Sequence, residues 1–195
     1  MFVLLRLFPN APRKRLTRAD RAILEMNGLL DQAGVELIEG DLIEKMPKNW
    51  LHIHALVTLQ YWLARAFGNE FVAPEASINV APEDNPTSEP EPDLVVLKLP
   101  TKEFKGSAKP GSEDLHLIVE VSGATLDFDS TVKAALYARA RIPEFWVLDL
   151  EGRQMGVYRD PRQGAYQSIV PYGEKESVSP LSAPDAQFVV GSPFE

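Results

Sequence analysis

The sequence predicts a mixed α/β fold in which a mixed β-sheet is flanked by helices. An almost unbroken apolar run at residues 115–121 is typical of a strand that is buried on both faces of a sheet. A helical segment at 130–140 and another apolar run at 145–150 follow it. Because such strand–helix–strand crossovers are parallel and right-handed, we expect these two strands in one sheet. A strong helix at 51–67 precedes this unit.

The N-terminal part of the chain predicts a helix followed by a hairpin. Prolines at 9–12 indicate an extended leader, and Thr17 with Asp20 three residues later indicates a helix start. This helix is expected to continue to about residue 30. Two β-rich runs then flank residues 39–41, which predicts a hairpin.

The helix at 51–67 separates two histidines. Its apolar side chains recur at helical spacing: Leu56, Leu59, Leu63 and Phe67. His52 lies four residues before Leu56 on this buried stripe, whereas His54 lies on the more polar side. His52 is therefore the better candidate for a contact with a buried site.

The remaining elements follow from apolar runs and their breaks. Strands are expected at 71–80 and 94–99, and Asp129 is expected to cap the helix at 130–140. An antiparallel pair at 155–159 and 166–170 and an edge strand at 186–190 complete the chain. The length of 195 residues suits a single domain, residues 1–195, with residues 162–195 as a C-terminal strand extension.

Composition excludes several classes of protein. The chain has no cysteine, which rules out disulfides, zinc ribbons and thiol catalysis. No apolar run approaches the roughly 20 residues of a membrane span, and the apolar start lacks the features of a signal peptide. We therefore expect a cytoplasmic protein without a membrane partner. The net charge of −8 disfavours broad non-specific binding of nucleic acid but does not exclude a nuclease.

Basic residues near the N-terminus have two interpretations. The group comprises Arg13, Lys14, Arg15, Arg18 and Arg21. It could steer DNA, or it could be the solvated start of a helix, which is the more common situation.

Two acids stand inside or beside apolar strands. Asp93 comes directly before the run at 94–99, and Glu120 lies within the run at 115–121. A buried carboxylate needs a hydrogen-bonding partner, a cation or a proton, and paired carboxylates suit Mg²⁺ or Mn²⁺. Lys133, on the next helix, is a candidate to orient a metal-bound water. In the alternative interpretation there is no metal site: Asp93 lies in a turn, Glu120 forms a buried ion pair and Lys133 lies on a solvated helix face.

The order of these motifs resembles a known family. In the order of four motifs, the chain is similar to the Uma-type restriction endonuclease family. The motifs are P-D at Asp93, V-E-V-S at Glu120, D-x-x-x-K-x-x-x-Y-A at Lys133 and I-P-E-F-W-V-L-D at 142–149. That family belongs to the PD-(D/E)XK nuclease superfamily, and the resemblance covers residues 16–161. It implies a restriction-endonuclease-like core.

The resemblance also implies roles for particular residues. Asp93 and Glu120 match the metal-binding acids, and in the leading hypothesis the Val121 carbonyl would be a third ligand. Ser122 occupies the position of the motif lysine, and the lysine is displaced to Lys133 on the helix. Tyr137 follows on the same face as Lys133. The superfamily often has a glutamate on the first core helix, and here His52 stands in for it or the ligand is absent.

The implied function is a Mg²⁺-dependent (or Mn²⁺-dependent) endonuclease that hydrolyses DNA phosphodiester bonds and acts as a homodimer. An alternative is a catalytically inactive nuclease-fold protein that binds DNA or protein. The acidic charge and the serine at position 122 favour this alternative.

Overall fold

The computed structural model describes residues 14–30, 34–106 and 108–195. The main sheet has six strands in the order β3-β4-β5-β6-β7-β8, and only the β5–β6 pair is parallel. These strands are β3 (Val72–Pro74), β4 (Leu94–Leu97), β5 (Leu115–Ser122), β6 (Glu144–Asp149), β7 (Gln154–Arg162) and β8 (Ala165–Gly173). The mixed sheet and the parallel crossover are therefore confirmed.

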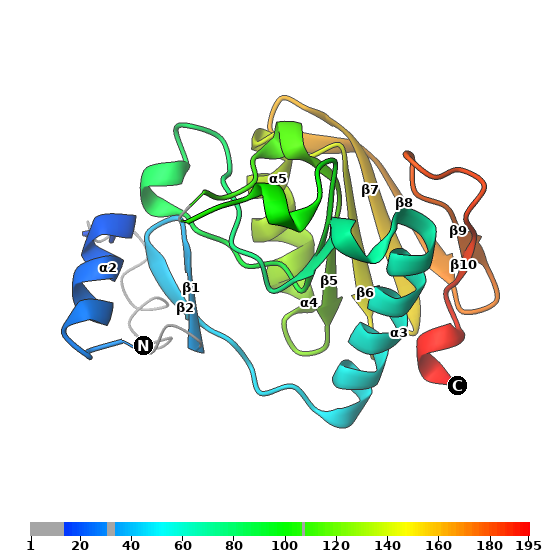
Figure 1. The fold of residues 1–195 in the computed structure, drawn as a ribbon. Helices are drawn as coiled ribbons and strands as arrows, with labels where there is room; N and C mark the ends of the chain where they lie inside the picture. Colours follow the sequence, from blue (N-terminus) through cyan, green and yellow to red (C-terminus); the bar gives the residue numbers. More distant parts are fainter. Residues whose placement is uncertain (1–13, 31–33, 107) are drawn as a thin grey trace.

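Helices cover both faces of this sheet (Figure 1). On one face, α3 (Trp50–Phe67) packs Ala55, Leu59 and Leu63 against alternate residues of β4 and β5. On the other face lies a helical segment made of α4 (Leu126–Phe128), a π-helical turn (Asp129–Lys133) and α5 (Ala134–Arg139). Because strand residues alternate between faces, Glu120 lies on the α5 side while Val119 and Val121 lie on the α3 side.

The first and the last described elements form smaller units at opposite ends of the molecule (Figure 1). At one end are α2 (Arg18–Met26) and a hairpin of β1 (Val35–Ile38) and β2 (Asp41–Glu44). Thr17 and Asp20 form the expected capping box. At the other end, β9 (Ser177–Val178) pairs with β10 (Phe188–Val189) in a separate two-stranded sheet.

Several expected boundaries were wrong. The first helix ends at Met26 instead of residue 30, and the strand expected at 71–80 stops at Pro74. Pro74 has no N–H to continue the ladder, and Glu75 takes a left-handed φ of 50°. The strand expected at 186–190 does not join the main sheet. The leader expected at 9–12 lies outside the described residues.

The helix at 130–140 begins earlier than expected, and its predicted cap was wrong. Asp129 has helical backbone angles and lies inside the continuous segment that starts at Leu126. Its carboxylate accepts hydrogen bonds from the Ser122 and Thr125 hydroxyls instead of capping the helix. Asp129 thereby ties the helical segment to the end of β5.

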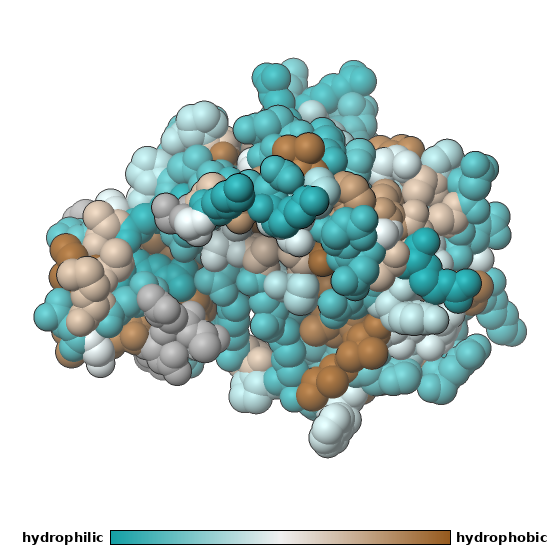
Figure 2. Space-filling view, viewed as in Figure 1, coloured by the Kyte–Doolittle hydropathy of each residue, from teal (hydrophilic) through white to brown (hydrophobic). Residues whose placement is uncertain are grey.

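The surface view shows a mostly hydrophilic face with an apolar group over the first turns of α3 (Figure 2). Exposed apolar side chains on this helix include Leu51, Val57 and Tyr61. Within the described ranges, no helix combines the length and the apolarity needed to cross a membrane.

Candidate active site

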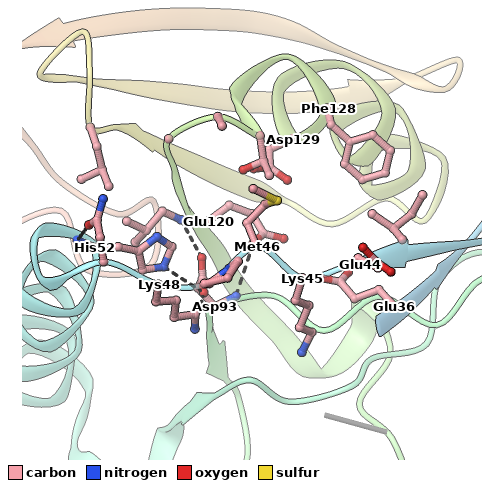
Figure 3. Close-up of a pocket in the computed structure, with 18 of the residues that line it drawn as sticks. Glu36, Glu44, Lys45, Met46, Lys48, His52, Asp93, Glu120, Phe128 and Asp129 are labelled. Carbon is pink, nitrogen blue, oxygen red and sulfur yellow. Dashed lines mark hydrogen bonds and ion pairs between the residues drawn. The ribbon is translucent and has the colours of Figure 1, made fainter. Parts of the chain in front are cut away.

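A pocket of about 380 Å³ opens where the β1–β2 hairpin, the start of α3, the ends of β4 and β5 and the π-helical turn meet. Eight acidic side chains line it, and four of them are buried: Glu36, Asp93, Glu120 and Asp129. Lys133 enters from the helical segment. Lys48 and His52 enter from the segment around the start of α3 (Figure 3). The pocket thus gathers the main residues that the sequence singled out.

Antiparallel pairing brings Asp93 and Glu120 together. Leu94 pairs with Val119, so the residues one position further on each strand, Asp93 and Glu120, are cross-strand neighbours. The Val121 N–H donates to Asp93 Oδ2 at 2.8 Å, and the Asp93 N–H lies 3.4 Å from Glu120 Oε2. Both residues are almost fully buried, with Asp93 9% exposed and Glu120 4% exposed. The predicted juxtaposition of the two acids is present.

Lys133 reaches this pair from its helix. Its ammonium donates to Glu120 Oε1 at 2.9 Å and to Glu36 Oε1 at 3.1 Å. Asp129, one helical turn earlier, has its Oδ1 3.7 Å from the same nitrogen. Lys133 is only 4% exposed, so the alternative of a solvated helix face is wrong.

Tyr137 is also part of the cluster. Its hydroxyl donates to Glu120 Oε1 at 2.9 Å, so this carboxylate oxygen accepts from both residues of the K-x-x-x-Y motif. Two donors from one helix fix the Glu120 side chain against the sheet.

The local environment shifts the pKa values of the two acids in opposite directions. Burial raises the pKa of Glu120, and its carboxylate neighbours raise it further, although Lys133 opposes the rise. Burial would also raise the pKa of Asp93, but His52, Lys48 and the Val121 N–H outweigh it and lower this pKa to about 2. Burial would lower the pKa of Lys133, but Glu120, Glu36 and Asp129 raise it overall. Lys133 therefore stays an ammonium in the folded protein.

The other candidate residues lie nearby with different contacts. The Ser122 hydroxyl donates to Asp129 at 2.8 Å, so it anchors the helical segment and does not take the place of a lysine. His52 Nε2 lies 3.6 Å from Asp93 Oδ1, slightly beyond hydrogen-bond distance. Val121 belongs to the pocket lining.

Two residues of the site were not predicted from the sequence. Glu36 lies on β1, in the run V-E-L-I, and its side chain accepts a hydrogen bond from Lys133. Glu36 could have been found by the same signal that identified Glu120, because each is an acid within an apolar strand. Lys48 lies in the segment between β2 and α3, where neither periodicity nor spacing indicated its contact with Asp93.

Three of the basic residues near the N-terminus, Arg15, Arg18 and Arg21, are engaged in ion pairs. Arg21 pairs with Glu25, Glu89 and Glu91, and Arg18 pairs with Glu89. These contacts attach α2 to the segment before β4, so Arg18 and Arg21 have a structural role. Arg13 lies outside the described residues.

Replacing Tyr137 with phenylalanine is expected to lower the free energy of unfolding by about 1–2 kcal/mol, because one hydrogen bond to a buried charged group is lost. The ring, which packs edge-on against Phe145, is retained. Urea denaturation measures the change. An unchanged midpoint would contradict the contribution assigned to this hydroxyl.

The donor set fits a hard divalent cation in part. Across the described ranges, no three His, Asp or Glu side chains converge to hold a metal ion. Two carboxylates nevertheless share one end of the pocket, and Glu120 carries a raised pKa in surroundings rich in negative charge. Mg²⁺ commonly takes one or two carboxylates and keeps several waters. Asp93 and Glu120 could therefore supply the protein ligands of such a cation.

Comparison with known proteins places the chain in a family. The family model Uma2, described as "Putative restriction endonuclease", matches residues 23–191. The chain belongs to the Uma2 family. A comparison with curated proteins finds no match.

The Uma2 assignment agrees with a solved structure of similar fold, described as "a putative nuclease belonging to DUF820 from Anabaena variabilis ATCC 29413". The TM-score is 0.65 at 14% sequence identity, over 87% of this chain and 95% of that chain. At this identity the likeness concerns the fold alone. The family match confirms the family resemblance, and the similar fold confirms the fold class expected from the motifs.

Proposed function

We propose that this protein is a Mg²⁺- or Mn²⁺-dependent endonuclease that hydrolyses DNA phosphodiester bonds. The observation that carries the proposal is the placement of Asp93 and Glu120 as cross-strand neighbours with the Lys133 ammonium 2.9 Å from Glu120. This is a pair of hard oxygen ligands with an adjacent cation, at the end of a pocket open to solvent.

The residues that would hold the cation are Asp93, Glu120 and the Val121 carbonyl. When bound, the ion would supply Lewis-acid activation of water and charge stabilisation at the phosphoryl oxygen. Tyr137 and Lys133 keep the Glu120 carboxylate in place, and the Val121 N–H does the same for Asp93. The protein therefore positions both acids before any substrate arrives.

Lys133 has a further role in the proposal. Among the described residues, two carboxylates accept hydrogen bonds from its ammonium, while Asp129 lies at 3.7 Å. An ammonium has three N–H donors, which leaves one for a water molecule beside Glu120. Lys133 would orient the attacking water through this donor and offset the negative charge that develops at the phosphate.

We also propose that the protein acts as a homodimer, because two copies of the site could cut the two strands of a duplex together, and that it is cytoplasmic. Light scattering coupled to size exclusion would measure the mass in solution.

The experiment that tests the proposal incubates the purified full-length protein with supercoiled plasmid and with single-stranded DNA. Parallel reactions contain MgCl₂, MnCl₂ or EDTA. The proposal expects cleavage of DNA with a divalent cation and none with EDTA. Cleavage that is unaffected by EDTA would contradict it. Absence of cleavage with retained DNA binding would instead support the inactive binding module.

A further inference from the structure

The Lys48 side chain occupies the pocket side of Asp93. It lies in the segment between β2 and α3, and its ammonium is 3.0 Å from Asp93 Oδ1 (Figure 3). The same nitrogen donates to Glu75 Oε1 at 2.6 Å. Lys48 thus links an acid of the candidate active site to an acid at the rim of the pocket.

The two oxygens of Asp93 have different partners. Oδ2 accepts the Val121 N–H at 2.8 Å, which fixes the carboxylate to β5. Oδ1 has Lys48 at 3.0 Å and His52 Nε2 at 3.6 Å. A divalent cation that bound Asp93 through Oδ1 would lie next to the ammonium, and like charges at such distances repel strongly.

Lys48 and Lys133 differ in how easily they can move. The Lys133 side chain is 5% exposed and is held by carboxylates on three elements. The Lys48 side chain is 26% exposed and extends from an irregular segment. A lysine side chain with a solvated ammonium can change position at a small cost in free energy, whereas moving a lysine out of a buried ion pair costs much more.

Glu75 provides Lys48 with a partner away from Asp93. Its side chain is 54% exposed, so it lies on the solvent side of the ammonium. Glu75 directly follows β3, has a left-handed φ of 50° and lines the pocket. Lys48 can therefore leave Asp93 and keep its hydrogen bond to Glu75.

We propose that Lys48 is a displaceable counter-ion of Asp93: it neutralises this carboxylate in the cation-free protein and withdraws toward Glu75 when a divalent cation binds. The inference rests on the proposed function, since it concerns the cation of that same site. It makes Lys48 a residue that weakens cation binding and thereby sets the cation concentration at which the site fills.

The test is calorimetric titration of MgCl₂ into the full-length protein without DNA. Lys48→Met is expected to bind Mg²⁺ about tenfold more tightly than wild type, because a competing charge is removed. Lys48→Arg keeps the charge and is expected to bind as wild type does. Lys45→Met is a matched control, because Lys45 lines the same pocket but pairs with Glu91 at 2.6 Å. Its affinity is expected to change by less than about twofold.

Unchanged or weaker Mg²⁺ binding by Lys48→Met would overturn the inference, provided that thermal melts without Mg²⁺ show this variant to be folded. Equal tightening in Lys48→Met and Lys45→Met would also overturn it, because general charge and not contact with Asp93 would then set the affinity. If wild type binds Mg²⁺ and Lys48→Met binds it with the same affinity, the proposed function stands and only this inference fails. If neither wild type nor Lys48→Met binds, both fail.

Discussion

Asp93→Asn is expected to lower kcat/KM for DNA cleavage by about 10³-fold, which corresponds to about 4 kcal/mol of lost transition-state stabilisation. The substitution removes a charged metal ligand but preserves the shape of the side chain. The carbonyl oxygen of the new side-chain amide, in place of Asp93 Oδ2, can still accept the Val121 N–H that fixes residue 93 to β5. The measurement is the initial rate of plasmid cleavage at several MgCl₂ concentrations.

Glu174→Gln is the matched control for this variant. Glu174 is a surface acid whose side chain is 45% exposed and pairs with Arg153. Its removal changes the net charge by the same amount and should leave the rate within about twofold of wild type. A folded Asp93→Asn protein that cleaves at the wild-type rate would remove Asp93 from the mechanism.

Lys133→Met is expected to lower the free energy of unfolding by about 3 kcal/mol, because it leaves buried carboxylates without their cation. Glu36, Glu120 and Asp129 all lie within 4 Å of its ammonium. The raised pKa of Glu120 limits the loss, since a carboxyl that takes up a proton no longer needs a counter-ion. Cleavage should also fall, because the donor to the attacking water is gone.

Urea denaturation measures this loss in stability, with Lys98→Met as the control for an exposed lysine. Added Mg²⁺ should restore part of the stability of Lys133→Met, since a bound cation supplies charge near the same carboxylates. A loss below about 1 kcal/mol would place Lys133 among surface ion pairs, which contribute little.

Much of the candidate site could be predicted because its acids interrupt apolar strands. Burial of Glu120 follows from its position within a strand that is covered on both faces, and this environment requires a partner. The crossover between β5 and β6 then places Lys133 on the helix above the same strand. These inferences need only local pattern and the handedness of the connection.

Other features depend on contacts between distant parts of the chain. Glu36 joins the site because the β1–β2 hairpin folds beside the sheet, and no spacing rule relates it to Lys133, 97 residues later. The contact of Lys48 arises from an irregular segment whose path is set by its two flanking elements. Asp129 belongs to a π-helical turn, whose hydrogen bonds the apolar periodicity does not reveal.

Whether Asp93 and Glu120 form the cation site of a nuclease can be tested directly with Glu120→Gln. The side-chain amide can still accept from Tyr137 and Lys133, so the fold should persist while the charged ligand is lost. Wild type and Glu120→Gln would be compared at equal concentrations of folded protein for Mg²⁺-dependent plasmid cleavage. Cleavage by wild type and a loss of at least about 10³-fold in the variant are expected. Equal Mg²⁺-dependent cleavage by the two proteins would contradict this expectation.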